Sequence, residues 1–135
     1  MLNLSKGLIS IIDDDFDIAD LFCDALNDIQ GLVVLKFTDP YIALEHFKIN
    51  MKDYAVVISD LRMPVINGLQ LLKTVKDLNP TTRTILMTAF DMQDEVFEEY
   101  TKNKIINGFL QKPIELKLLV DEVNKQMIAT EIVVW

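Results

Sequence analysis

Apolar runs alternate with segments of helical period along the whole chain. Residues 8–12 form a short, nearly continuous apolar run. The segment after it places apolar residues three or four positions apart, which predicts one face of an amphipathic helix. The residues of that face are Ile18, Leu21, Phe22, Ala25, Leu26 and Ile29. Gly31 is expected to end this helix as a C-cap glycine.

The same alternation continues to the end of the sequence. Further strands are expected at residues 33–37, 55–59, 84–88 and 105–110. Asp39-Pro40 opens a second helix, because aspartate is a favoured N-cap and proline suits the first helical position. A third helix follows Asn67-Gly68 and ends before Pro80. Two more are expected, one capped by Asp91 with Val96, Phe97 and Tyr100 on its buried side, and one from Pro113 with Leu116, Leu119, Val120 and Val123 facing inward.

Five strand–helix units predict an α/β fold with a parallel sheet covered on both faces. The strands expected at 8–12, 55–59 and 84–88 are nearly all apolar, as central strands are. Lys36 in the second strand and Asn107 and Gln111 beside the fifth are typical of sheet edges. We therefore expect a flavodoxin-like, doubly wound (βα)5 fold with strand order 2-1-3-4-5.

Composition excludes several classes of function. The chain has 135 residues, the size of one domain, and a net charge of −8 at pH 7. This charge repels a phosphate backbone, so direct nucleic-acid binding is not expected. No apolar run approaches the ~18 residues of a membrane span, so membrane insertion is not expected. Cys23 is the single cysteine, which rules out an intrachain disulfide and suits a cytoplasmic protein.

Polar residues stand where four of the predicted strands end. Asp13 and Asp14 follow the first strand, Asp60 the third, Thr88 ends the fourth and Lys112 follows the fifth. In open α/β sheets, ligands bind outside the carboxyl ends of the strands, where the strand order reverses. These side chains are therefore expected to meet in one crevice.

Carboxylates that converge in a partly dry site repel one another unless a cation is present. An oxygen-only ligand set suits Mg²⁺, and Asp13, Asp14 and Asp60 are the candidate ligands. Asp60 is also the best candidate nucleophile, since an aspartate can accept a phosphoryl group as an acyl phosphate. The ammonium group of Lys112 would neutralise phosphoryl charge, and the Thr88 hydroxyl would donate a hydrogen bond to a phosphoryl oxygen.

Four motifs in order give the sequence a family resemblance. They are Ile11-Ile12-Asp13-Asp14-Asp15, Ser59-Asp60-Leu61-Arg62-Met63-Pro64 with Asn67-Gly68, Met87-Thr88-Ala89, and Gly108-Phe109-Leu110-Gln111-Lys112-Pro113. With them the chain resembles the response-regulator receiver domain of two-component signalling, in particular chemotaxis-type single-domain receivers. The resemblance assigns residues 1–129 to the receiver domain and leaves residues 130–135 as an apolar C-terminal tail.

The resemblance implies a signalling phosphoacceptor that catalyses only its own phosphorylation and dephosphorylation. Asp60 would accept a phosphoryl group from a sensor histidine kinase or a phosphotransfer protein. Asp13, Asp14, Asp60 and the backbone carbonyl of Arg62 would hold Mg²⁺, for which Mn²⁺ could substitute.

The resemblance also implies a switch. Thr88 would move toward the phosphoryl group and Phe109 would turn inward. Lys112 would pair with phosphoryl oxygens, and the Lys112–Pro113 bond would be cis. The changed surface, made of the fourth helix, fifth strand and fifth helix, would bind a downstream protein or a second copy of the chain.

Three other functions fit part of the sequence. A degenerate receiver that acts only as an interaction module would not need the complete set of acidic, hydroxyl and lysine groups present here. Asp13-Asp14-Asp15 contains the Asp-x-Asp pattern of haloacid-dehalogenase-type phosphatases, but a further acidic pair and room for a cap insertion are missing. An FMN carrier of the same strand order would place a phosphate where three aspartates repel it.

Overall fold

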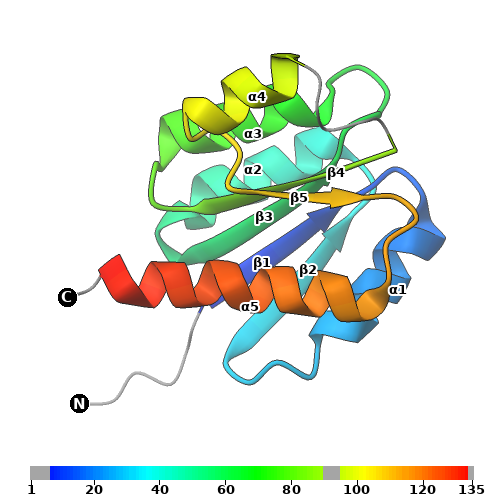
Figure 1. The fold of residues 1–135 in the computed structure, drawn as a ribbon. Coiled ribbons are helices and arrows are strands. Elements are labelled where there is room, and N and C mark those ends of the chain that lie inside the picture. The colour runs from blue at the N-terminus through cyan, green and yellow to red at the C-terminus, as the bar shows by residue number, and fades with distance from the viewer. Residues whose placement is uncertain (1–6, 90–94, 134–135) are drawn as a thin grey trace.

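A five-stranded parallel sheet lies at the centre of the protein, with helices on both faces (Figure 1). The structure is a computed structural model and describes residues 7–89 and 95–133. The strands are β1 (Gly7–Ile12), β2 (Leu32–Phe37), β3 (Tyr54–Asp60), β4 (Arg83–Thr88) and β5 (Gly108–Gln111). The helices are α1 (Phe16–Leu26), α2 (Pro40–Asn50), α3 (Gly68–Leu78), α4 (Glu95–Lys102) and α5 (Leu116–Val133), with a 3₁₀ turn at Met51–Asp53. The strand order is β2-β1-β3-β4-β5, which confirms the expected topology.

The helices divide the apolar residues into two cores, one on each face of the sheet. Helices α1 and α5 pack together on one face, while α2, α3 and α4 cover the other. Every residue of β3 is buried, and from Val56 to Ile58 its side chains alternate between the two cores. Val56 and Ile58 join the α1–α5 core, whereas Val57 joins the α2–α3 core. Burial on both faces explains why β3 is an unbroken apolar run up to Ser59-Asp60.

Side chains in the loops at the carboxyl edge of the sheet cap the helices that follow. Asp15 accepts hydrogen bonds from the backbone N–H groups of Asp17 and Ile18 at the start of α1. Asp39 accepts from Tyr41, with Pro40 as the first residue of α2, as predicted. Each cap satisfies N–H groups that a helix leaves unpaired, so the loops beside the site have defined ends.

Three predicted boundaries were wrong. Helix α1 ends at Leu26 instead of near Gly31, which has φ +85° in the turn into β2. β5 begins at Gly108 instead of residue 105, because the N–H groups of Ile105 and Ile106 both bond to the Tyr100 carbonyl of α4.

The last helix also starts later than predicted. Helix α5 begins at Leu116, three residues after Pro113, and the Leu119 N–H bonds back to the Glu115 carbonyl. Leu116 stands in the first turn and is exposed, whereas Leu119 and Val123 are buried as predicted.

Some predictions fall outside the described part of the chain. These are the Asp91 cap, the side chains of Val96 and Phe97, and residues 134–135 of the expected tail. The expected tail at 130–135 overlaps the end of α5, which continues to Val133. Within the described ranges, none of the helices has the length and apolar character that crossing a membrane requires.

Candidate phosphoryl-transfer site

The parallel strands bring the predicted site residues to one edge of the sheet. Asp13 directly follows β1, and Asp60 is the last residue of the adjacent β3. Thr88 ends β4, which pairs with β3 on its other side. The backbone N–H of Lys112 donates to the Thr88 carbonyl at 2.8 Å, which fixes the end of β5 beside β4. Residues far apart in the sequence therefore meet because their strands are neighbours.

Three carboxylates form a cluster at this edge. Each of Asp13, Asp14 and Asp60 offers an oxygen atom, and these oxygens lie within 4.8 Å of one another. Asp13 is 1% exposed and Asp14 lies at the surface, so the cluster runs from the interior to solvent. The Asp13 Oδ1 atom accepts a hydrogen bond from the Asp15 N–H at 2.9 Å, which fixes its carboxylate. An all-oxygen set with this negative charge fits a small divalent cation such as Mg²⁺.

Lys112 connects two of the carboxylates. Its Nζ atom lies 3.1 Å from Asp13 Oδ2 and 3.0 Å from Asp60 Oδ1. The Lys112 side chain is 27% exposed and that of Asp60 is 11% exposed, so water screens this pair only in part. One ammonium among three carboxylates leaves the cluster negative, and a cation is still favoured there. The peptide bond between Lys112 and Pro113 is cis, as the family resemblance predicts.

The environment of Asp60 disfavours its charged form. Burial raises the pKa of Asp60 above its usual value, and the charges of Asp13 and Asp14 add to this, although the hydrogen bond from Lys112 opposes it. Burial also lowers the pKa of Lys112, but the hydrogen bond to Asp60 and the charge of Asp13 outweigh burial and leave that pKa raised. Both pKa values are raised, because burial and the surrounding carboxylates disfavour negative charge on Asp60, while the carboxylates favour the protonated form of Lys112.

The loop between β3 and α3 forms one wall of the site. Its base is closed by two hydrogen bonds of 2.8 Å, from the Leu61 N–H to the Met87 carbonyl and from the Gly68 N–H to the Leu61 carbonyl. A Cβ atom on Gly68 would lie 2.2 Å from the Asp60 carbonyl oxygen, so only glycine permits this closure. Asn67 then begins α3 in a capping box with Gln70.

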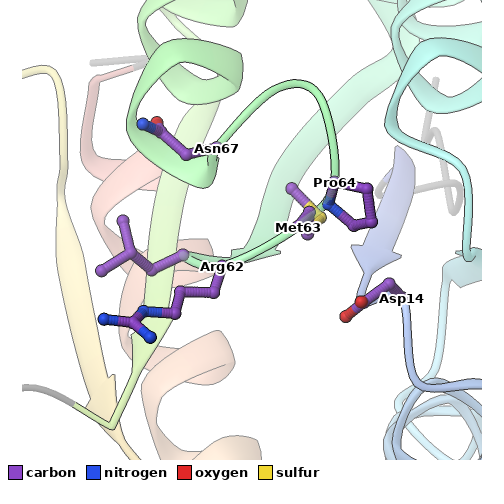
Figure 2. A pocket seen from close by; sticks show the side chains of 6 residues that line it. Asp14, Arg62, Met63, Pro64 and Asn67 are labelled. Atoms are coloured by element: carbon purple, nitrogen blue, oxygen red, sulfur yellow. The ribbon is translucent and has the colours of Figure 1, made fainter.

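A hollow of about 540 Å³ lies between this loop and Asp14 (Figure 2). Its lining residues are Asp14, Leu61, Arg62, Met63, Pro64 and Asn67. The Arg62 side chain extends away from Asp14 in this view. Sequence reasoning treated Met63, Pro64 and Asn67 only as parts of a motif, although their place just after Asp60 indicates that they form a wall of the site.

The two residues expected to form a switch lie in different surroundings. Thr88 is fully buried and lines a cavity of about 160 Å³ together with Asp60 and Lys112. Phe109 is half-buried, packs against the α2–α3 core and borders a separate hollow next to α5. The structure thus brings Thr88 to the acceptor and leaves Phe109 one strand away, next to Leu86 in the β4–β5 register.

The sequence of this chain is similar to that of known proteins. Residues 9–124 match the family described as the response regulator receiver domain. The DNA-binding transcriptional regulator NtrC of Escherichia coli strain K12 is 31% identical over 113 residues, which cover 84% of this chain but 23% of that protein. The chain therefore spans about a quarter of the length of the curated NtrC relatives that it matches.

Solved structures show the same likeness over almost the whole chain. A response regulator receiver domain protein from Clostridium thermocellum superposes with a TM-score of 0.83 at 25% identity, covering 94% of this chain and 98% of that one. The receiver domain of the Francisella response regulator 1452 gives 0.75 at 27% identity, covering 92% and 98%.

Proposed function

Because this chain belongs to the response regulator receiver domain family, we propose that it accepts a phosphoryl group on Asp60 from a phosphohistidine and thereby changes its affinity for a partner. The observation that carries this proposal is the position of the Lys112 ammonium, which contacts both Asp13 and Asp60 beside the acidic cluster. Phosphoryl transfer depends mainly on positioning and charge neutralisation, and these groups provide both.

The reaction transfers a phosphoryl group from an imidazole nitrogen of the donor to a carboxylate oxygen of Asp60. A carboxylate oxygen of Asp60 forms a bond to phosphorus while the phosphorus–nitrogen bond to imidazole breaks. The electron pair of the broken bond stays on the imidazole nitrogen, which takes up a proton from solvent, and Asp60 becomes an acyl phosphate. Lys112 holds its ammonium beside Asp60, close enough to pair with phosphoryl oxygens on that residue. The Thr88 hydroxyl lines the same cavity and donates a hydrogen bond to one of these oxygens.

Asp13, Asp14, Asp60 and the backbone carbonyl of Arg62 would hold the Mg²⁺ that this family resemblance implies. The three carboxylate oxygens lie within 4.8 Å of one another, and Arg62 lines the same hollow as Asp14. When bound, Mg²⁺ supplies positive charge to the phosphoryl oxygens, and Mn²⁺ could substitute for it.

The phosphorylated state acts through a two-state equilibrium. Thr88 moves toward the phosphoryl group, Phe109 turns inward, and the surface formed by α4, β5 and α5 changes. This is the mode of action of chemotaxis-type single-domain receivers, in which the phosphorylated domain itself binds the downstream protein or a second copy.

The phosphodonor is a phosphohistidine of a sensor histidine kinase or a phosphotransfer protein. This chain has one histidine, and His46 is half-buried on α2 with its Nδ1 atom 2.7 Å from the Tyr54 hydroxyl oxygen. An imidazole held in this way on the α2 face of the sheet does not serve as an internal donor to Asp60.

Intact-mass measurement after incubation with phosphoramidate tests the proposal. We expect the wild-type chain to gain one phosphoryl mass in the presence of Mg²⁺ and to gain none when EDTA is present. Asp60→Asn should gain none in either condition, whereas Asp53→Asn, an acidic residue just before β3, should behave as wild type. Labelling of Asp60→Asn at the wild-type rate would contradict the proposal.

A further inference from the structure

The loop that follows Asp60 has a strained turn at its tip. Val65 has φ +74°, in the left-handed region that β-branched side chains strongly disfavour. The Ile66 N–H donates to the Pro64 carbonyl at 2.8 Å across this single residue. A hydrogen bond between residues i and i+2 with positive φ at the centre defines a γ-turn of the rare, strained hand. Glycine would occupy this position without a Cβ clash.

Burial does not explain a valine at this position. Val65 is 86% exposed, the highest value among the large apolar side chains in the described ranges. Its isopropyl group therefore contributes little to the core, while its backbone opposes folding. Strain retained at a surface residue beside a reaction centre suggests a role in function.

The place of Val65 indicates which partner it would meet. Met63 and Pro64 before it line the hollow that contains Asp14, and the loop arches over this hollow (Figure 2). The Asp60 side chain is 11% exposed. A donor protein must bring its phosphohistidine within bonding distance of this recessed carboxylate. The surface around that histidine must then cover the adjoining loop. A downstream target does not have to approach Asp60 in this way.

We propose that Val65 is a specificity-determining contact for the protein phosphodonor, which buries the isopropyl group under an apolar side chain beside its phosphohistidine. The inference rests on the proposed phosphoacceptor function of Asp60. A small donor undergoes the same bond changes at Asp60 but does not contact the loop tip. Only the transfer rate from a protein donor should therefore depend on Val65.

Transfer rates from two donors to matched variants test this contact. The small donor is phosphoramidate, and the protein donor is the autophosphorylated histidine kinase that labels the wild-type chain fastest in a purified panel. Val65→Gly and Val65→Asn both remove the apolar side chain and introduce a residue that adopts positive φ readily. We expect each to slow kinase-to-chain transfer by about tenfold or more and to leave phosphoramidate labelling unchanged. Val65→Ile should retain the wild-type rate.

Ile49→Ala provides the control, because Ile49 is also a highly exposed apolar residue but lies at the end of α2 away from the carboxyl edge of the sheet. Its transfer rates should match wild type. Equal kinase transfer to all Val65 variants, or a panel in which no kinase labels the chain, would overturn the proposal. Weaker self-association with unchanged transfer would assign Val65 to a second copy instead and would also overturn it. Failure of phosphoramidate to label wild type would count against the phosphoacceptor function itself.

Discussion

The Lys112 ammonium nitrogen lies 3.0 Å from Asp60 Oδ1, although 52 positions separate the two residues in the sequence. The pair exists because β3 and β5 flank β4 in the sheet and end at the same edge. The same ammonium contacts Asp13 at the end of β1, so one cation connects three strands.

Removal of the Lys112 charge should strengthen binding of Mg²⁺. In Lys112→Gln the three carboxylates keep their negative charge and lose the cation that partly neutralises it. Coulomb attraction at this range predicts affinity that is higher by roughly threefold or more, while phosphoramidate labelling of Asp60 slows. Titration calorimetry gives the affinity. Weaker Mg²⁺ binding would show that Lys112 orients the carboxylates instead of competing with the metal.

Loss of one carboxylate should have the opposite effect on the metal. Asp14→Ala should lower Mg²⁺ affinity by about tenfold or more, since Mg²⁺ is held by few protein carboxylates. Asp17→Ala is the matched control, because Asp17 is an exposed acidic residue in the first turn of α1 outside the cluster. Calorimetry should show at most a small change for it. Equal losses in the two variants would mean that only the general negative field attracts the ion.

Gly68 and Gly108 should differ in their tolerance of alanine. In Gly68→Ala the new Cβ would meet the Asp60 carbonyl oxygen at 2.2 Å, a backbone atom that cannot move without displacing β3. In Gly108→Ala it would meet the ends of the Glu122 and Gln126 side chains at 2.8 and 3.0 Å, and side-chain ends can shift further than the backbone of a central strand. Urea unfolding should show a loss of about 3 kcal/mol for the first and about 1 kcal/mol for the second. Similar losses would contradict the described closure of the β3–α3 loop.

Alkaline pH should destabilise the protein through Tyr54. Burial raises the pKa of this phenol from 10.0 to about 12 in the folded chain. Between these values the unfolded state loses the proton first, so the stabilisation present below pH 10 is lost as the pH rises toward 12. The difference corresponds to about 2–3 kcal/mol. Urea unfolding at several alkaline pH values should show this loss in wild type, and a substantially smaller loss in Tyr54→Phe. An identical pH dependence in the two proteins would contradict this account.

Much of the fold follows from local pattern. Short apolar runs and period-3.6 apolar positions predict every β-strand and α-helix of the described structure, although not the 3₁₀ turn at Met51–Asp53, and the polar content of the strands predicts which are central. That strand order predicts that Asp13, Asp60, Thr88 and Lys112 lie at one edge of the sheet, as they do in the structure. These predictions succeed because burial on both faces of a parallel sheet leaves a clear apolar signal.

The details that sequence reasoning missed depend on tertiary contacts. The Tyr100 carbonyl takes the N–H groups of Ile105 and Ile106, so β5 starts later than its apolar run suggests. The γ-turn at Val65 contradicts the intrinsic preference of valine, and local propensity would not place it there. Both are cases in which the surrounding structure overrides the local preference of the chain.

The central claim is that Asp60 is the residue that carries the phosphoryl group. Borohydride reduction of the phosphoramidate-treated protein tests it most directly, since an acyl phosphate is reduced to the alcohol and a free carboxylate is not. Tandem mass spectrometry of the digested chain should find homoserine in place of aspartate at position 60, dependent on Mg²⁺, with Asp13 and Asp14 unmodified. Homoserine at position 13 or 14, or an unmodified residue 60 in a chain that has gained phosphoryl mass, would contradict the account.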